Sequence, residues 1–243
     1  MRLKILLNSN SIIKIPLHYN HILQGFIYSL FEPIFRRFLH SEGFNYKQRR
    51  FKLFCFSRLN GKFKINLKNF EFFSPVDFLV SSPKFEILQN LISGLLKKQE
   101  FYLDKNKVFI EEIKVLQSPD FKENRIKIKM LSPLTIYSTF EKSGKKKTYY
   151  YSPEEPEFSH LLKENLKKKY KLVFEKERDF FFKITPLKVD FKKDQKIIIY
   201  KGNVIKAWMG TYILESEPQI LELSYSTGLG AKNSQGFGMW DLL

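Results

Sequence analysis

The 243-residue sequence has a single cysteine, Cys55, and lacks the signals of several common kinds of protein. One thiol cannot form a disulfide within the chain, and no cysteine–histidine spacing typical of a zinc site occurs. No apolar run reaches the roughly 20 residues that span a bilayer. Residues 1–8 are too short and too alternating in polarity for a secretory signal peptide. We therefore expect a cytoplasmic protein that needs no metal, no cofactor and no membrane.

Acidic residues are also scarce relative to basic ones. The chain has 42 Lys+Arg against 25 Asp+Glu, which gives a formal net charge of +17. Such a charge attracts polyanions, and the absence of a separate basic amphipathic helix favours nucleic acid over a membrane surface. Aromatic residues make up 16% of the chain. This is enough apolar material for a packed core in one large domain or two small ones.

The hydrophobic pattern of residues 1–120 predicts elements in the order β-α-β-β-α-β. Pro33 divides the first helical stretch into two pieces, because proline disrupts a helix interior. Asn60-Gly61 predicts a tight turn between two strands of a hairpin. The expected elements are a strand at 2–7, helical pieces at 18–31 and 33–39, strands at 52–58, 62–68 and 77–81, a helix from Phe85, and a strand at 108–116. This is the order of a ferredoxin-like domain.

Residues 125–243 repeat the plan more loosely. Ser152 and Glu155 match a capping box before a helix whose apolar face includes Phe158 and Leu166. The other expected elements are strands at 125–130, 147–151, 180–188 and 196–200, a strand at 204–214 that is continuous or bent at Gly210, a helix at 218–224, and a strand at 239–243. We predict an α+β protein with two tandem ferredoxin-like domains, residues 1–120 and 125–243.

The most informative segment is the glycine-rich stretch 228–238. A dinucleotide-binding fingerprint would need a third glycine at Asn233 and a following helix and strand, and the Gly-Lys-Ser/Thr of a phosphate-binding P-loop is missing. Glycines allow positive φ and close approach of the main chain, and consecutive N–H groups can bind an anion. We predict that this loop binds an RNA backbone, rather than merely turning the chain, through Gly228, Gly230, Lys232, Asn233, Ser234, Gln235, Gly236 and Gly238.

Two Gly-hydrophobic-Gly pairs separated by five residues near the C-terminus resemble the signature loop of the RAMP superfamily. The chain is similar to its Cas-six family of CRISPR-associated endoribonucleases. Residues 16–28, 52–57 and 131–134 resemble that family's first helix, second strand and start of the second domain. The resemblance implies tandem ferredoxin-like domains and RNA in the cleft between them. It also implies metal-independent cleavage of CRISPR repeat transcripts (pre-crRNA) into guide RNAs with 2′,3′-cyclic phosphate and 5′-hydroxyl ends.

Metal-independent cleavage needs a base, an acid and positive charge beside the transition state. By resemblance, His40 matches the family's catalytic histidine, Tyr28 its tyrosine and Lys52 its lysine. Tyr28 and His40 are off-face on a straight helix, and a break at Pro33 could bring them together. His21 shares a helical stripe with Tyr28 and is the alternative histidine.

Lys47, Arg49 and Arg50 are alternatives to Lys52, and His160 is expected on the surface. Alternation in 125–130 gives a basic strand face of Arg125, Lys127 and Lys129, which we expect to contact RNA.

The expected partner is CRISPR repeat RNA, with subunits of a CRISPR effector complex as further candidates, and the chain is expected to be a monomer or homodimer. Two other functions stay open: a non-catalytic RAMP-type RNA-binding subunit of such a complex, and a general basic nucleic-acid-binding protein.

Overall fold

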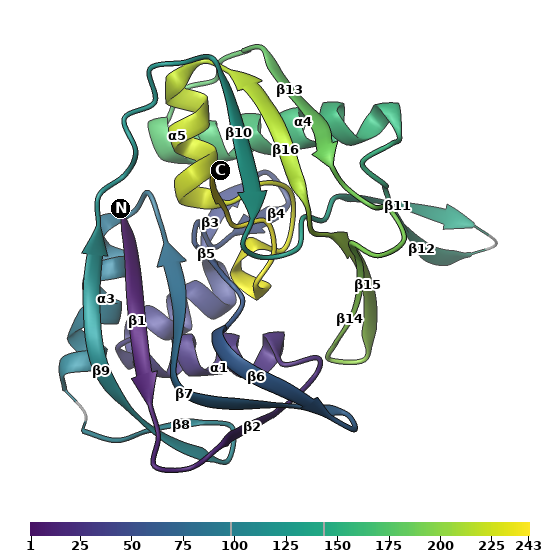
Figure 1. Ribbon diagram of the computed structural model, residues 1–243. Coiled ribbons are helices and arrows are strands. Elements are labelled where there is room, and N and C mark those ends of the chain that lie inside the picture. The colour runs from purple at the N-terminus through teal and green to yellow at the C-terminus, as the bar shows by residue number, and fades with distance from the viewer. Residues whose placement is uncertain (98, 143) are drawn as a thin grey trace.

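The computed structural model describes residues 1–97, 99–142 and 144–243 and has a mixed α+β architecture. Two antiparallel sheets form the frame of two units, each with its own apolar core. Figure 1 shows the second unit above the first, with the C-terminal segment between them. None of the helices in these three ranges is both long and apolar enough to cross a membrane.

The first unit is built around β1 (Arg2–Asn8), which pairs with β7 (Asn69–Ser81) on one side and β9 (Asn106–Leu116) on the other. Leu3, Ile5 and Leu7 of β1 are fully buried, because alternate side chains of a strand face the same side of a sheet. The remaining strands of this sheet lie beside β7 and β9: β2 (Ile13–Pro16), β5 (Cys55–Phe56), β6 (Asn60–Asn66) and β8 (Phe101–Leu103).

Two helices of the first unit, α1 (Asn20–Leu30) and α3 (Phe85–Leu96), bury their apolar stripes in the same core as β1. Their positions agree with the predicted periodicity. Beyond α1, the chain forms α2 (Pro33–Arg37), a π-helical turn η1 (Phe38–Glu42), and a short ribbon of β3 (Phe44–Tyr46) and β4 (Arg49–Phe51).

The predicted hairpin turn at Asn60-Gly61 is wrong. Both residues lie in β6, and the reversal occurs at Leu67-Lys68, which joins β6 to β7. Because β7 is 13 residues long, β5 and β6 pair with it one after the other without a reversal between them. The predicted strand 52–58 is correspondingly reduced to Cys55–Phe56, and the predicted strand 77–81 is the end of β7.

The sheet of the second unit has the order β13-β16-β10-β17. Its strands are β13 (Phe182–Lys188), β16 (Thr211–Ser216), β10 (Arg125–Met130) and β17 (Trp240–Leu242), and its helices are α4 (Pro156–Phe174) and α5 (Pro218–Thr227). Gly210, at a φ of 112°, separates β15 (Asn203–Trp208) from β16, so the bent alternative for residues 204–214 is confirmed.

The capping box was predicted one turn too early. Glu155 is itself the N-cap of α4, and its Oε1 accepts a hydrogen bond from the Ser152 main-chain N–H at 2.5 Å in the preceding turn. Pro156 occupies the first helical position, where its missing N–H costs nothing. The helix therefore begins at Pro156.

Two hairpins extend from the second unit. One consists of β11 (Tyr137–Lys142) and β12 (Lys145–Tyr150), and Figure 1 shows it projecting away from the body of the molecule. The other consists of β14 (Gln195–Tyr200) and β15 (Asn203–Trp208), and it descends toward the first unit.

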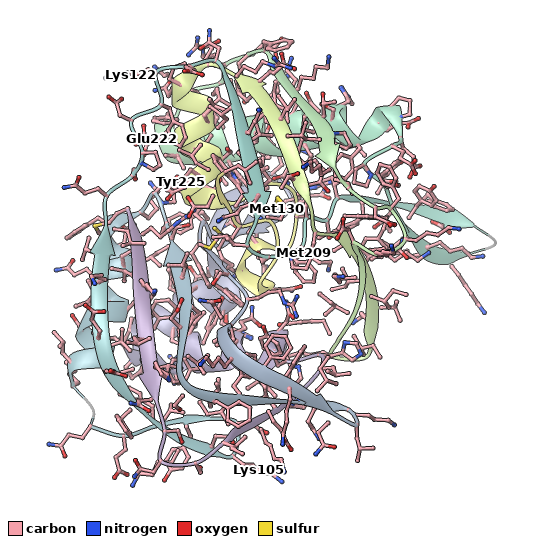
Figure 2. All side chains as sticks on the ribbon, viewed as in Figure 1. Lys105, Lys122, Met130, Met209, Glu222 and Tyr225 are labelled. Atoms are coloured by element: carbon pink, nitrogen blue, oxygen red, sulfur yellow. The ribbon has the colours of Figure 1, made fainter. Side chains whose placement is uncertain are left out.

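Arg2, which is fully buried, joins the two units at the opposite end from these hairpins. Its Nη2 donates to the carbonyl oxygens of Tyr225 at 3.2 Å and Trp240 at 2.9 Å. Its guanidinium carbon lies 3.6 Å from the centroid of the Tyr225 ring. Figure 2 shows Tyr225 on α5 above the start of β1.

Candidate active site

His40 lies on the π-helical turn η1, which follows the break at Pro33. The turn folds the chain back toward α1, so that the rings of Tyr28 and His40 meet edge to face with centroids 6.4 Å apart and an interplanar angle of 88°. The Tyr28 ring also contacts Phe54 at a centroid distance of 6.0 Å. The expectation that a break at Pro33 would bring Tyr28 and His40 together is therefore met by the geometry.

Lys52, which follows β4, reaches the same turn. Its Nζ donates to the His40 carbonyl oxygen at 3.0 Å, and the neighbouring Arg50 donates from Nη1 to the Ser41 carbonyl oxygen at 2.6 Å. Burial, with a smaller contribution from Arg50, lowers the pKa of Lys52. The Lys52 ammonium group is thus held against the main chain of the residue that carries the imidazole.

A cavity of about 690 Å³ contains these side chains. One face of α1 lines it, so that His21 and Tyr28, two helical turns apart, border the same space. Its lining includes His21, Gln24, Tyr28, Arg36, His40, Lys52 and Tyr200. Burial raises the pKa of Tyr28, so its hydroxyl is protonated at neutral pH. The arrangement places an imidazole, a phenol and an ammonium group around one solvent-filled space.

Tyr200 comes from β14 of the second unit and completes the cavity wall. Its hydroxyl donates to Gln24 Oε1, and its ring meets His21 edge to face with centroids 6.4 Å apart. Gln24 in turn donates from Nε2 to the Ser234 carbonyl oxygen at 2.6 Å. The cavity is therefore shaped by both units and by the glycine-rich loop, a contact that no local pattern in the sequence could predict.

The four glycines of the loop are buried and have positive φ, as the sequence predicts for close main-chain approach. A Cβ atom at Gly230 would lie 2.3 Å from the Thr135 carbonyl oxygen, and one at Gly236 would lie 2.7 Å from the Phe56 ring. The groups that approach these glycines are the protein's own. The glycines let the loop fit tightly between the two units.

Asn233 is turned into the loop instead of outward. Its Nδ2 donates to the carbonyl oxygens of Leu229 at 2.8 Å and Phe237 at 3.0 Å, and its Oδ1 accepts from Lys169 Nζ at 2.7 Å. The expectation that Asn233 offers a free donor to RNA is therefore not met. Lys232, Ser234 and Gln235, by contrast, border a cavity.

That second cavity, of about 750 Å³, lies beside the first and shares Lys52, Ser234 and Gln235 with it. Its walls are the segment from Gln48 to Phe54, β11 and the glycine-rich loop. Its lining is strongly cationic, with Arg49, Arg50, Lys52, Lys146, Lys169 and Lys232. Such a surface suits a polyanion.

Lys169 of α4 is almost completely buried at this cavity, and its side chain binds the glycine-rich loop. Its Nζ donates to the carbonyl oxygens of Gly228 at 2.7 Å and Gly230 at 3.1 Å, as well as to Asn233. Burial lowers the pKa of Lys169 to about 7. In the sequence, Lys169 is the last of three consecutive lysines and gives no sign that it is buried.

Other predicted residues lie elsewhere. Arg125, Lys127 and Lys129 are exposed on β10 and line neither cavity, and His160 is exposed on α4 as expected. Among the residues that the structure describes, no group of three or more His, Cys, Asp or Glu side chains is placed to hold a metal ion.

The arrangement of two α+β units is also found in solved structures of other proteins. A solved structure described as "An RAMP protein binding different RNA substrates" has the same fold, with a TM-score of 0.84 and 22% sequence identity. The match covers 100% of this chain and 99% of that one.

The chain belongs to the Cas6 family. A family model for "CRISPR associated protein Cas6, C-terminal" matches residues 116–242, and one for "CRISPR-associated protein Cas6, N-terminal" matches residues 14–114. A solved structure described as "CRISPR associated protein Cas6" is 27% identical with a TM-score of 0.82, covering 100% of this chain and 99% of that one.

Two curated relatives are similar over nearly the whole chain. "CRISPR-associated endoribonuclease Cas6 1" of Methanocaldococcus jannaschii is 31% identical, over 98% of this chain and 91% of its own length. "CRISPR-associated endoribonuclease Cas6" of Pyrococcus furiosus is 29% identical, over 93% of this chain and 83% of its own length.

Proposed function

We propose that this protein is an endoribonuclease that cuts CRISPR repeat transcripts into guide RNAs without a metal ion. The observation that carries the proposal is the convergence of Tyr28, His40 and Lys52, from three separate segments, on one cavity. The names of the curated relatives support the endoribonuclease activity. The products would carry 2′,3′-cyclic phosphate and 5′-hydroxyl ends.

The reaction would be an attack by the ribose 2′-oxygen on the adjacent phosphorus. A bond forms between the 2′-oxygen and phosphorus, and the bond from phosphorus to the 5′-oxygen breaks. One group must take the 2′-hydroxyl proton, and one must give a proton to the leaving 5′-oxygen. His40 would carry out one of these transfers, because an imidazole can accept a proton on one ring nitrogen and donate one from the other. Lys52 would stabilise the negative charge on the phosphoryl oxygens.

Tyr28 would position the RNA by a hydrogen bond from its hydroxyl. Because burial raises its pKa, the phenol stays protonated at neutral pH and is a donor instead of a base. Its ring also fixes the orientation of the His40 imidazole through the edge-to-face contact.

We propose that the two units are tandem ferredoxin-like domains, residues 1–120 and 125–243. In the first unit, four neighbouring strands have the order β6-β7-β1-β9, and the sheet of the second unit has the order β13-β16-β10-β17. When the four strands of each set are numbered along the chain, both orders read 2-3-1-4. Separate cores and separate family matches support this division. RNA would lie across Ser234 and Gln235, where the two cavities meet, and across Lys232 in the second cavity. Arg125, Lys127 and Lys129 would offer a second contact face.

The test is incubation of the protein with repeat RNA from its own CRISPR array in EDTA, followed by mapping of the cut ends. We expect cleavage with a cyclic phosphate end, and a loss of about 10²- to 10⁴-fold in rate for His40→Ala. His160→Ala is the matched control, because His160 is exposed on α4 outside both cavities. Cleavage that disappears in EDTA and returns with magnesium would refute the mechanism.

The second candidate function is that of an RNA-holding subunit without catalysis. The observation that favours it is the cationic cavity beside the loop, which would serve binding equally well. Tight binding of repeat RNA with no cleavage by the wild-type protein would favour this function. Equal binding of repeat RNA and unrelated RNA would instead indicate a general nucleic-acid-binding protein.

A further inference from the structure

Asn165 of α4 is a buried polar residue whose side-chain oxygen is unpaired among the residues that the structure describes. Its side chain lines the 750 Å³ cavity, the residue is 7% exposed, and its Oδ1 accepts no hydrogen bond within the described part of the chain. Most buried polar groups in proteins are paired. Asn233, which lines the same cavity, follows this rule, since its amide nitrogen and oxygen are both satisfied. The Asn165 amide therefore has hydrogen-bonding capacity that the described residues do not use.

The charge of the cavity indicates what kind of molecule this is. Of the described residues that line it, none is acidic, whereas Arg49, Arg50, Lys146 and Lys232 are basic. Lys169, one helical turn after Asn165 on the same helix face, adds a buried amine. A ligand that carries phosphate is therefore favoured over a neutral or cationic one.

An aromatic ring borders the same space. Tyr137 of β11 lines the cavity, and the Lys232 ammonium group lies 5.1 Å from the centroid of its ring. Unpaired RNA bases commonly stack on such rings while polar side chains bond their edges. A bound RNA phosphate would attract the Lys232 ammonium group away from the Tyr137 ring. The face of that ring would then be free to stack on a base.

The cavity also continues from the proposed cleavage site. Lys52, Ser234 and Gln235 line both cavities, so an RNA strand with its reacting phosphate beside Lys52 extends directly into the second one. The occupant is thus a nucleotide close to the cut.

We propose that this cavity binds one unpaired nucleotide of the RNA, with its phosphate on the cationic rim, its base on Tyr137 and its base edge on the Asn165 amide. An amide offers one acceptor and two donors, so it can bond two adjacent groups of a base. Adenine is the base that asparagine reads most often. The inference rests on the proposed function in taking RNA as the ligand and in placing this nucleotide close to the cut.

The experiment uses four uridine heptamers that differ only in the central nucleotide, A, C, G or U. All carry 2′-O-methyl ribose, which prevents attack by the 2′-oxygen, and a 5′-fluorophore for binding by anisotropy. We expect the wild-type protein to prefer one central base, adenine first, by about tenfold. Asn165→Leu should bring the four affinities within about twofold of one another. If the leucine variant does not fold, Asn165→Ser replaces it, and the same result is expected.

Lys146→Ala is the contrasting variant, because a phosphate contact carries no base information. It should weaken all four heptamers alike and keep the preference. Equal affinities in the wild-type protein, or a preference that survives both Asn165 variants, would overturn the inference. An Asn165-dependent preference in a protein that never cuts repeat RNA would refute the proposed cleavage and leave the base site standing.

Discussion

Gly43 ends the turn that carries His40, and it has no room for a side chain. Its φ is +63°, and a Cβ atom there would lie 2.6 Å from the Phe51 carbonyl oxygen and 3.1 Å from Lys52 Nζ. Gly43→Ala must therefore move Lys52 or the turn. A displacement of about 1 Å in a catalytic group can cost about 10²-fold in rate.

We accordingly expect Gly43→Ala to lower repeat cleavage by about 10²-fold in single-turnover assays. Gly144→Ala is the matched control, because Gly144 has a φ of +70° but a Cβ atom there would meet no atom within 4 Å. Both variants carry the left-handed strain of about 1–2 kcal/mol. Full cleavage by Gly43→Ala would show that the contact with Lys52 does not matter.

Glu71 gives a prediction about pH at the scale of single residues. Its carboxylate forms ion pairs with Lys14 Nζ at 3.0 Å and Lys64 Nζ at 3.1 Å, and it accepts a hydrogen bond from Asn66 Nδ2 at 3.0 Å. The hydrogen bond from Lys14, followed by those from Asn66 and Lys64, lowers the pKa of Glu71 from 4.5 to about 2. A carboxyl with a lower pKa in the folded state stabilises the fold above its unfolded pKa and loses that contribution as the pH falls.

Glu71→Gln should therefore lower the thermal midpoint at pH 7. The difference from the wild-type protein should shrink as the pH falls from about 4.5 to about 2, the interval between the two pKa values of Glu71. Thermal melts followed by circular dichroism across this range would measure it. A difference that stays constant with pH would contradict the assignment.

At the scale of elements, the glycine-rich loop depends on α4. Lys169→Met keeps an apolar stem of similar length but leaves the Gly228 and Gly230 carbonyl oxygens and Asn233 Oδ1 without their shared donor. Unpaired buried groups cost about 1–3 kcal/mol each, so we expect a loss of at least about 2 kcal/mol in the free energy of unfolding. Chemical denaturation would measure the loss, and hydrogen exchange should locate it in residues 228–238.

The neighbouring Lys168→Met provides the control. It makes the same substitution on the same helix, but Lys168 is only half-buried and no hydrogen bond joins it to the loop within the described residues. Its effect should stay within about 0.5 kcal/mol. Equal effects of the two variants would mean that the charge on α4, and not the anchoring of the loop, determines stability.

The elements show where a sequence is informative and where it is not. Helices α1 and α3 follow from local periodicity, and the break at Pro33 follows from proline geometry. The approach of His40 to Tyr28 could therefore be predicted. The hairpin turn predicted at Asn60-Gly61 is wrong because a local turn signal carries no information about the length of the partner strand β7. Helix α4 begins late because Pro156, not Ser152, opens it.

The candidate site was predictable only in part for the same reason. The resemblance placed Lys52, but its bond to the His40 carbonyl depends on the β3–β4 ribbon. Tyr200 meets Gln24 across the two units, and Lys169 reaches the loop from a distant helix. These contacts join residues far apart in the sequence, and no local spacing encodes them.

At the scale of the whole molecule, function depends on how the two units sit together. The first cavity takes His40 from one unit and Tyr200 from the other, and the loop closes both cavities. Any change that loosens this contact should therefore affect stability and RNA cleavage together, even where it lies far from His40.

Arg2 is the residue that tests this coupling. It lies at the other end of the contact, it lines neither cavity, and it is fully buried with its Nη2 on the Tyr225 and Trp240 carbonyl oxygens. Arg2→Met removes the donor that the two oxygens share, so that the Trp240 oxygen loses its side-chain partner and the Tyr225 oxygen keeps a hydrogen bond from Ser81 Oγ at 3.3 Å. We expect a loss of about 2–4 kcal/mol in the free energy of unfolding. Cleavage of repeat RNA should fall as well, because the second unit, which contributes Tyr200 to the cavity wall, is no longer fixed in position against the first unit.

Arg178→Met is the matched control. Arg178 is an exposed arginine outside both cavities, and it pairs with Glu217 of its own unit at 2.5 Å. Exposed pairs of this kind contribute about 0–1 kcal/mol. Urea denaturation followed by the fluorescence of the two buried tryptophans, Trp208 and Trp240, measures stability. Single-turnover cleavage measures function. If Arg2→Met loses stability but cuts at the wild-type rate under native conditions, the cavity does not depend on the contact at Arg2, and the two units position the site through the loop alone.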